Sequence, residues 1–364
     1  MVDAGEFSCN REEPRDKFSK CWTFSVDDAT PNELDPPVCV PDDVKESFSE
    51  DGFAVFPNVL KKSLIEELNN RLEEVLRGRY DRNVKPDKTP KLLKNEYRNP
   101  QTQAKTISKK DQSSDSENEA MAKPKISYAA GPLGFSGNFQ NVKVLQVINV
   151  HKADSVFRKL AVSPALGRVV AELAGWTNVG TRLAQDQVWA KPPGAPALTF
   201  HRDSPYFMFT PPDVVTVWVA LDDMDEEDIG PLQYVKGSHK WGDGRIGSAG
   251  LFFEGGTDLL ESAAKRAGKS SWVVESMVGL LAGGISIHDG RTWHGSGANT
   301  SRSRPRRGLG LHFVPANVRF TADAAQSRLW RSYVGDGSVP PDEIALPEQD
   351  FPITWLPEHL RDNK

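Results

Sequence analysis

The stretch ALTFHRDSPYFMFTPPDVVTVWVAL, residues 197–221, indicates the fold class of this chain. It holds two short runs rich in β-branched and aromatic residues, at 197–203 and 213–221, with a Pro-containing segment between them. Such runs, with Gly or Pro at their ends, are typical of short β-strands. The first run ends on the polar triplet His201-Arg202-Asp203, whose side chains are candidates for chemistry.

Further short β-type runs lie on both sides of this stretch. They are TRLAQDQVWA (181–190), GPLQYV (230–235), GISIHD (284–289) and RGLGLHFV (307–314). Helical spacing of apolar residues dominates the region before them, and we place helix starts at Ser63, Asp154 and Ser163. Ser63 with Glu66 forms a capping-box pattern. Many short strands after a helical start predict a mainly β fold with flanking helices, as a sandwich or a barrel.

The bulk composition is that of an ordinary globular protein of 364 residues. Hydrophobic residues make up 38% of the chain, charged residues 26%, and the formal net charge is −5. This balance predicts neither nucleic acid nor an anionic membrane as a partner, and no apolar run is long enough to span a bilayer. We expect a small-molecule substrate as the partner.

The three cysteines, Cys9, Cys21 and Cys39, predict neither a disulfide framework nor a zinc site, because they are odd in number and widely spaced. The N-terminal residues lack the apolar core of a secretory signal. We therefore expect reduced thiols and a cytoplasmic location.

Composition also divides the chain. Residues 1–42 are polar and rich in Pro, Asp and Glu, which predicts an N-terminal arm that is at most partly ordered. Residues 43–364 are expected to form a single domain. Within it, the dense charge and low hydrophobicity at about 85–126 predict a flexible insertion.

His201 and Asp203 are two residues apart. In a strand their side chains would share one face and Arg202 would point to the other, so one rigid element could supply two metal ligands. Alone, this pattern is weak evidence, since a hydrogen-bonded pair at a strand end looks the same. His294 lies in HDGRTWHGSGAN beside glycines that leave room for a metal. His288 is a rival ligand, but its place inside a strand favours a position behind the ligands or in the core.

Two histidines and one carboxylate form the facial triad of non-haem Fe(II) oxygenases, which leaves one side of the metal open. A fixed cation near such a triad is what a dicarboxylate co-substrate requires. His201, Asp203 and His294, together with a nearby arginine, therefore predict a metal-dependent oxidising enzyme that uses 2-oxoglutarate and O2.

The arginine can be chosen from the alternation in RRGLGLHFVP, residues 306–315. Arg306 shares one strand face with two glycines and His312, which leaves space for a small ligand, whereas the other face is apolar and should pack in the core. Arg304 has the same parity and remains an alternative anchor, but a proline separates it from the strand. Arg302, Arg304 and Arg307 are otherwise expected in a solvated or phosphate-facing cluster.

The chain resembles the phytanoyl-CoA dioxygenase family from about Phe48 to Phe320. The stretches that carry the resemblance are FHRDSPYFMFTPPDVVTVWVALDDMDEEDIGPLQYVKGSHKWG (200–242) and SIHDGRTWHGSGANTSRSRPRRGLGLHF (286–313). The resemblance implies a double-stranded β-helix (jelly-roll, cupin-like) core with Fe(II) as the metal. It also implies 2-oxoglutarate and O2 as co-substrates, and hydroxylation of a C–H bond with release of succinate and CO2.

The resemblance further implies roles for single residues. Those that would hold the iron are His201, Asp203 and His294. Arg306 would bind the far carboxylate of 2-oxoglutarate, and Trp218 matches a family tryptophan that borders the co-substrate. Gln187 and Gln146 fall near other co-substrate contacts, although both residue types differ from the family pattern.

The pattern does not specify the substrate. Four side chains near the predicted ligands are candidates for the entrance of the site: Arg202, Tyr206, Arg291 and Trp293. For Tyr206 and Trp218, plain packing inside the barrel is the alternative. Two other functions are a jelly-roll protein that binds or senses a small molecule without turnover, and a cupin-type metal enzyme that does not use 2-oxoglutarate. The complete ligand set and Arg306 favour the dioxygenase.

Overall fold

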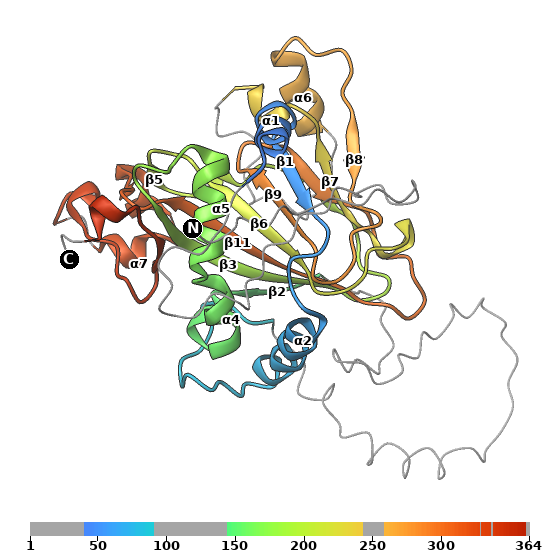
Figure 1. Ribbon diagram of the computed structural model, residues 1–364, viewed down its shortest axis with the longest axis horizontal. Coiled ribbons are helices and arrows are strands. Elements are labelled where there is room, and N and C mark those ends of the chain that lie inside the picture. Colours follow the sequence, from blue (N-terminus) through green and yellow to red (C-terminus); the bar gives the residue numbers. More distant parts are fainter. Residues whose placement is uncertain (1–39, 91–143, 243–257, 328, 336–337, 362–364) are drawn as a thin grey trace, which may run out of the picture.

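The computed structural model describes residues 40–90, 144–242, 258–327, 329–335 and 338–361, whose strands form three antiparallel sheets (Figure 1). The largest sheet has the order β1-β9-β6-β11-β3-β13, and β2 also pairs with β3. Its strands are β1 (Phe53–Phe56), β2 (Leu145–Ile148), β3 (Thr181–Lys191), β6 (Val215–Ala220), β9 (Ile285–Asp289), β11 (Arg306–Pro315) and β13 (Ile353–Trp355).

The second sheet has the order β4-β10-β7-β8 and faces the pocket described below. Its strands are β4 (Leu198–His201), β10 (His294–Ser296), β7 (Leu232–Val235) and β8 (Val274–Ser276). A third, small sheet pairs β5 (Phe209–Thr210) with β12 (Arg319–Phe320). The mainly β fold with flanking helices is confirmed.

Four helices cover one face of the seven-stranded sheet (Figure 1). They are α1 (Asp42–Asp51), α2 (Lys62–Leu76), α4 (Ser155–Ala161) and α5 (Pro164–Ala174). Strand β11 shows how the sequence produces this layering. Leu309, Leu311 and Phe313 belong to the core under the helices, whereas Gly310 and His312 line the pocket on the opposite face.

The predicted helix starts are confirmed at two of three places. The Asp154 side chain accepts hydrogen bonds from Val156 N (3.0 Å) and Phe157 N (3.2 Å) and caps α4. The Ser163 side chain accepts one from Leu166 N (3.4 Å) at the start of α5. The capping box at Ser63 is wrong, because α2 begins at Lys62 and its start has no side-chain hydrogen bond.

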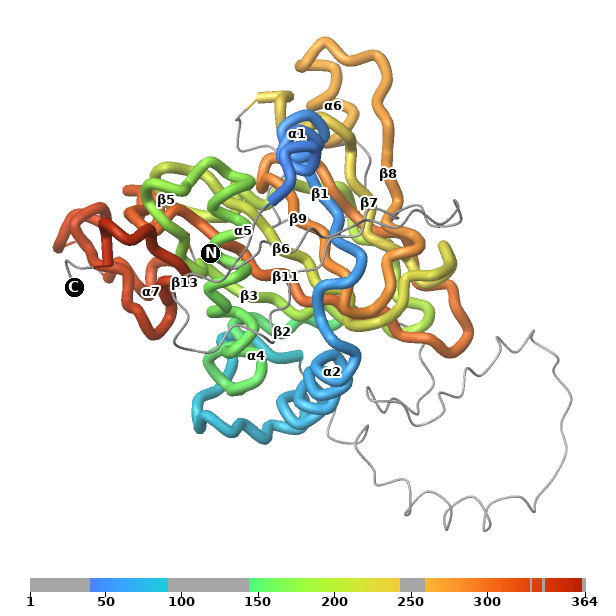
Figure 2. The backbone as a smooth tube through the Cα atoms, viewed as in Figure 1, coloured from blue at the N-terminus to red at the C-terminus, as the bar shows by residue number. Residues whose placement is uncertain are grey.

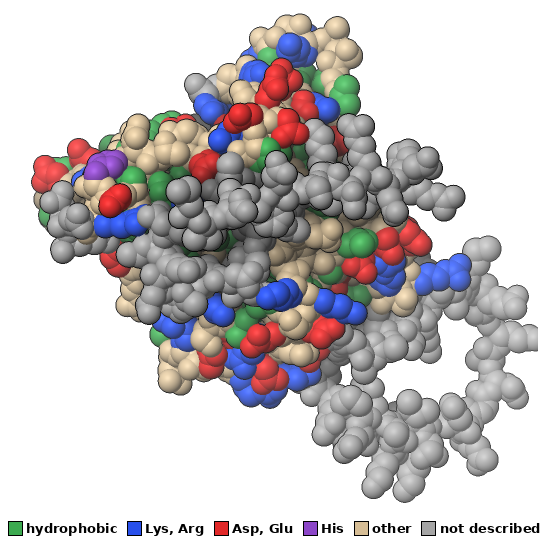
Figure 3. Space-filling model, in the orientation of Figure 1, with side chains coloured by type: hydrophobic (Ala, Val, Ile, Leu, Met, Phe, Trp, Pro, Cys, Tyr) green, Lys and Arg blue, Asp and Glu red, His purple; other side chains and the backbone are tan. Residues whose placement is uncertain are grey.

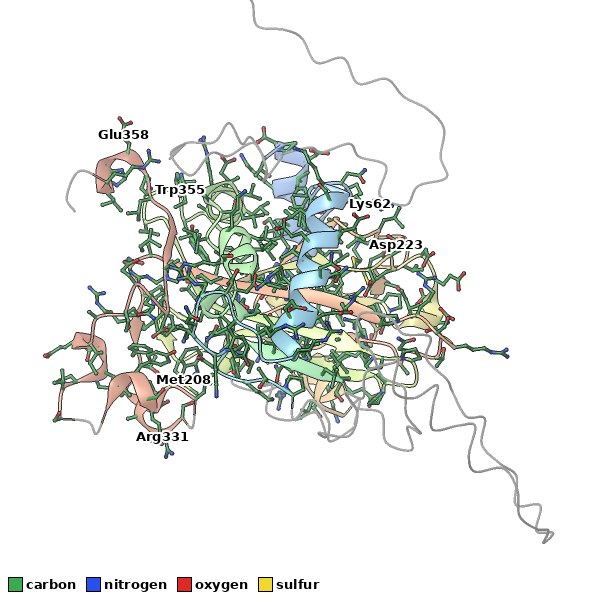
Figure 4. All side chains as sticks on the ribbon, turned by 90° about the horizontal axis from the view of Figure 1, so that it is seen from below. Lys62, Met208, Asp223, Arg331, Trp355 and Glu358 are labelled. Carbon is green, nitrogen blue, oxygen red and sulfur yellow. The ribbon has the colours of Figure 1, made fainter. Side chains whose placement is uncertain are left out.

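The C-terminal part of the chain lies at one end of the barrel (red in Figure 2). Here α7 (Arg331–Val334) packs near the loop that follows β4, and Figure 4 shows Met208 of that loop and Arg331 on the same side of the molecule. The Trp330 Nε1 atom donates a hydrogen bond to the Tyr206 carbonyl (3.0 Å). The C-terminal aromatic side chains therefore support the loop that carries Asp203.

Most of the predicted arm and insertion lies outside the described residues. Val40, at the end of the arm, is buried, and its amide donates to Glu172 Oε2 (3.2 Å). At the start of the insertion, the amide of Asp87 donates to the Ile148 carbonyl (2.9 Å), so these residues extend the edge of β2.

On the face shown in Figure 3, the acidic and basic side chains of the described residues are interspersed. Among the helices of the described ranges, including α6 (Asp258–Arg266), none combines the length and the apolar character needed to cross a bilayer.

Candidate metal centre and its pocket

The three predicted metal ligands come together at the inner face of the four-stranded sheet. His201 is the last residue of β4 and His294 the first residue of β10, and these two residues are directly opposite each other in the antiparallel pair. Their ring centroids are 4.1 Å apart. The register of the sheet alone therefore brings together two imidazoles that are far apart in the sequence.

The Asp203 carboxylate lies at the same place, but the backbone that positions it is not the strand that was expected. The expectation that His201 and Asp203 share a strand face is wrong, because β4 ends at His201 and Asp203 has helical backbone angles (φ −81°, ψ −43°). The amides of Asp203 and Ser204 both donate to the carbonyl of Gly290 (2.8 and 2.9 Å). This anchor at the end of β9 turns the chain so that the carboxylate faces the two imidazoles.

The donor atoms of the three side chains surround one position. Asp203 Oδ1 lies 3.9 Å from His201 Nε2 and 3.6 Å from His294 Nε2, and all three donor atoms are within 4.8 Å of one another. Metal bonds of about 2.1 Å place neighbouring ligand atoms about 3 Å apart, so small side-chain movements would close the set around an ion. Within the described ranges this is the one such group of His, Cys, Asp and Glu side chains.

Backbone carbonyls select the ring nitrogen that faces the metal position. His201 Nδ1 lies 2.8 Å from the Thr199 carbonyl, and His294 Nδ1 lies 2.9 Å from the Thr292 carbonyl. A carbonyl can only accept, so each Nδ1 carries the proton and each Nε2 has its lone pair toward Asp203. Burial lowers the pKa of both histidines to about 4, so both are neutral at neutral pH, as a ligand must be.

A two-armed network holds the other oxygen of Asp203. Thr216 Oγ1 donates to Asp203 Oδ2 (2.6 Å), so the Thr216 hydroxyl must accept from His312 Nδ1 (2.9 Å). On the other arm, His288 Nε2 lies 3.0 Å from Oδ2, and His288 Nδ1 lies 3.0 Å from the Tyr234 hydroxyl. His288 thus sits behind the ligands, as the sequence favoured. Such partners fix the orientation of a ligating carboxylate.

The charge of Asp203 results from opposing effects. Burial alone would raise the pKa of its carboxyl group, but the nearby His294 and the hydrogen bond from His288 hold that pKa well below its usual value. The carboxylate is therefore ionised, with Oδ1 directed at the metal position.

The metal position lies in a pocket of about 620 Å³, a volume that includes open solvent at its mouth. Four aromatic side chains line it: Trp189, Tyr206, Phe207 and Trp218. Gln187 lines the same pocket, and its amide nitrogen donates to Gln185 Oε1 (2.5 Å).

Arg306 lines the pocket, as the strand alternation predicts. Its side chain is 1% exposed, its Nε donates to the Gly230 carbonyl (3.2 Å), and its Nη2 has no hydrogen-bond partner among the described residues. Burial lowers the pKa of Arg306 to about 10, which leaves the guanidinium charged at neutral pH. A buried cation with an unsatisfied donor is the group expected where an anion binds.

The neighbouring arginines lie elsewhere. Arg304 is partly exposed, forms an ion pair with Asp225 (2.5 Å) and is not among the residues that line the pocket. Arg307 was expected in a solvated cluster, and this is wrong: it is buried and pairs with Asp222 through two nitrogens (2.8 and 2.5 Å).

Trp218 lies beside Arg306 because the chain has no side chain at Gly308. The Arg306 guanidinium carbon is 5.7 Å from the Trp218 ring centroid. A Cβ atom at Gly308 would be 2.1 Å from Trp218 Cζ2, far inside contact distance. The glycine that follows the two arginines therefore makes the space that the indole fills.

Of the four predicted entrance residues, the structure places only Tyr206 at the pocket. Arg202 stacks over Trp293 (5.5 Å from the ring centroid), and Trp293 is buried in a separate apolar cluster. Arg291 holds Asp289 with two nitrogens (2.9 and 2.7 Å) and faces a different hollow. These three side chains are therefore not among the residues that line this pocket.

Gln146 is on β2, the strand beside β3 in the same sheet, and is not among the residues that line the pocket. Its amide nitrogen donates to Gln187 Oε1 (2.8 Å), and its own oxygen accepts from Lys88 Nζ (2.7 Å). Gln187 is therefore the member of the pair that reaches the pocket, and Gln146 positions it.

The sequence analysis missed several residues of this site. Thr216 alternates with Trp218 on β6, and Ser296 is two residues beyond His294 on β10. In both cases the i, i+2 alternation of a strand was a signal that could have found them. Lys191 shares a strand face with Gln187, but nothing in the sequence shows that it is buried.

The comparisons with known proteins agree with this geometry. A family model described as phytanoyl-CoA dioxygenase matches residues 48–308. The chain belongs to the phytanoyl-CoA dioxygenase family. A search of curated proteins returned no match.

Two solved structures share the fold of this family member. One is the epimerase SnoN in complex with Fe3+, alpha ketoglutarate and nogalamycin RO, at 20% identity and a TM-score of 0.56, covering 86% of this chain and 98% of that chain. The other is the carbocyclase SnoK from nogalamycin biosynthesis, at 18% identity and a TM-score of 0.54, covering 86% and 96%. With the two facing antiparallel sheets, this likeness confirms the jelly-roll core.

Proposed function

We propose that this member of the family is an Fe(II)- and 2-oxoglutarate-dependent dioxygenase that hydroxylates a C–H bond of a small organic substrate and releases succinate and CO2. One observation carries the proposal. The donor atoms of His201, Asp203 and His294 surround a single position, and the unsatisfied guanidinium of Arg306 lines the same pocket. A metal centre and a buried cation in one cavity match the two ends of a 2-keto dicarboxylate.

The residues present fit Fe(II). Two neutral imidazoles and one carboxylate would hold it through His201 Nε2, His294 Nε2 and Asp203 Oδ1. When bound, the metal supplies the activation of O2. The protein keeps both imidazoles deprotonated at Nε2 and fixes the carboxylate through Thr216 and His288.

Arg306 is proposed to form a bidentate pair with the distal carboxylate of 2-oxoglutarate. Its Nη2 atom has no partner among the described residues, and Trp218 restricts the guanidinium from one side. Planar pairing of this kind fixes orientation as well as position. Trp218 and Gln187 are proposed to border the co-substrate, with Gln146 as the support of Gln187.

The substrate is proposed to contact the aromatic and amide side of the pocket. Trp189, Tyr206 and Phe207 offer apolar surface that excludes water, and Gln187 offers a hydrogen-bonding group. This combination suits a small organic molecule with both apolar and polar parts. SnoN and SnoK are described as an alpha ketoglutarate dependent epimerase and carbocyclase, so a different outcome after C–H activation is the nearest alternative to hydroxylation.

Two further alternatives are a binding protein without turnover and a metal enzyme that does not use 2-oxoglutarate. Neither requires a buried arginine without a carboxylate partner at the pocket, so Arg306 argues against both.

One assay tests the proposal. The protein is loaded with Fe(II) without oxygen, O2 is then added with and without 2-oxoglutarate, and succinate is measured. We expect succinate from the wild type, at least at a slow uncoupled rate, and none from His201→Ala or Arg306→Ala. Arg304→Ala is the control and should resemble the wild type. Iron binding without any consumption of 2-oxoglutarate, over a broad panel of substrates, would refute the assignment.

We also propose that residues 43–364 fold as a single domain. The pairing of β13 with β3 and the contact of Trp330 with the Tyr206 carbonyl join the C-terminal part to the barrel. Limited proteolysis should therefore leave a core that still contains residues up to about 360. The cytoplasmic location stays a prediction.

A further inference from the structure

A second buried basic side chain lies directly beside Arg306. Lys191, the last residue of β3, is opposite Arg306 in the antiparallel register and is 0% exposed. Its Nζ atom donates to Ser296 Oγ (2.9 Å) and to the Gly297 carbonyl. Neither Lys191 nor Arg306 forms an ion pair with any residue of the described ranges, so this end of the barrel has two basic groups and no acidic partner for either.

This arrangement is unfavourable in the ligand-free protein. A buried charge without a partner raises the free energy of the folded state, and adjacent like charges add to it. Burial and the neighbouring Arg306 lower the pKa of Lys191 to about 6. The other groups that contact the Lys191 side chain are neutral, a hydroxyl and a carbonyl. The protein thus keeps a basic group in a place where only an incoming anion can stabilise its charged form.

We propose that Lys191 is a positioning residue for the distal carboxylate of the co-substrate and that, with Arg306, it makes the closed end of the pocket selective for a dicarboxylate. This inference rests on the proposed function. Lys191 acts by its charge and through Ser296, and it takes up a proton from solvent when the carboxylate arrives.

The hydrogen bonds of Ser296 indicate how Lys191 can act on the carboxylate of the co-substrate. Protonated Lys191 can only donate, so the Ser296 hydroxyl then accepts from it and must donate its own proton to another group. Ser296 is two residues after His294 on β10, and in the sheet it is opposite Leu198 and Leu232, which both line the pocket. Paired residues share a sheet face, so the Ser296 hydroxyl is on the pocket side of the sheet, where we propose that it donates to a carboxylate held by Arg306.

The test compares two keto acids of equal chain length. 2-Oxoglutarate carries the distal carboxylate, and 2-oxopentanoate carries a methyl group instead. Their affinities for the Fe(II)-loaded protein are measured by calorimetry without oxygen, so no turnover is involved. The variants are Lys191→Met and Lys191→Gln, of which the second keeps a hydrogen-bond donor for Ser296 but no charge. Lys236→Met, at a partly exposed lysine that pairs with Asp51 (2.9 Å), is the control.

We expect both Lys191 variants to lose about 10- to 100-fold in affinity for 2-oxoglutarate, the range of a hydrogen bond to a charged group, and to bind 2-oxopentanoate within twofold of wild type. The selectivity ratio should fall accordingly, and the control should keep it. Equal losses for both ligands, no loss for either, or wild-type selectivity in Lys191→Gln would overturn the role of the charge. If the wild type itself does not prefer 2-oxoglutarate, the proposed function fails instead.

Discussion

Thr216→Val removes one arm of the network that orients the metal-binding carboxylate while it keeps the shape of the side chain. The Thr216 hydroxyl donates to Asp203 Oδ2 at 2.6 Å and accepts from His312. A hydrogen bond to a charged group contributes about 1.5–3 kcal/mol, which corresponds to about 10- to 100-fold in affinity. The loss of a partner behind a metal ligand lowers metal affinity by a similar factor, about 10- to 100-fold. We therefore expect Fe(II) to bind Thr216→Val about 10- to 100-fold more weakly.

The measurement is an oxygen-free Fe(II) titration against a competing chelator, with the free energy of unfolding of the metal-free protein measured in parallel. Thr216→Ser keeps the hydroxyl and should bind the metal like the wild type. Thr354→Val is the matched control, because Thr354 is also buried and its hydroxyl pairs with Thr181 (2.8 Å). It should lose stability but not metal affinity. The reasoning is refuted if Thr216→Val and Thr216→Ser bind Fe(II) equally well.

Three further predictions follow from the charged groups. Arg306→Gln should weaken 2-oxoglutarate binding by about 10- to 100-fold in calorimetry, whereas Arg304→Gln, whose native side chain is exposed, should change it by less than about twofold. Lys152→Met should lower the free energy of unfolding by about 1.5–3 kcal/mol in chemical denaturation, because Lys152 is buried between the partly exposed Asp87 (3.0 Å) and Asp350 (2.6 Å), and it should leave Fe(II) affinity unchanged. The lowered pKa of Lys191 means that the unfolded chain binds more protons than the folded one between the folded pKa of about 6 and the ordinary value of 10.5. The stability of ligand-free wild type relative to Lys191→Met should therefore rise with pH by about 1.4 kcal/mol per unit across that window; equal pH slopes for the two proteins would contradict the shift.

For residues inside strands, the alternation of side chains in the sequence could predict which of them face the pocket. Alternation favoured Arg306 over Arg307, and the proline before the strand favoured it over Arg304; the structure places Arg306 at the pocket and Arg304 at the surface. The alternation of side chains between the two faces is a local property of an extended chain, so it does not depend on which strands lie beside it. The same property would have found Thr216 beside Trp218.

Residues just beyond a strand end could not be predicted in this way. Asp203 reaches the metal position only because Gly290, remote in sequence, accepts the two amides that turn the chain. Arg202 and Arg291 flank such turns, and both point away from the pocket. The ion pair of Arg307 with Asp222 joins residues far apart in the sequence, and no pattern around Arg307 indicates it.

The acidic and the basic groups of the site lie at different places, and this separation restricts the orientation in which a ligand can bind. At one end, Asp203 is held as an anion for a metal cation; at the other, Arg306 and Lys191 are held without acidic partners. In the proposed mode of binding, a 2-keto dicarboxylate would fit this polarity in one direction, with its keto acid at the metal and its distal carboxylate at Arg306, next to Lys191. That orientation would leave the wall formed by Trp189, Tyr206, Phe207 and Gln187 for the proposed substrate. Changes on that wall should alter which molecule is oxidised, whereas changes at Arg306 or Lys191 should alter whether the co-substrate binds at all.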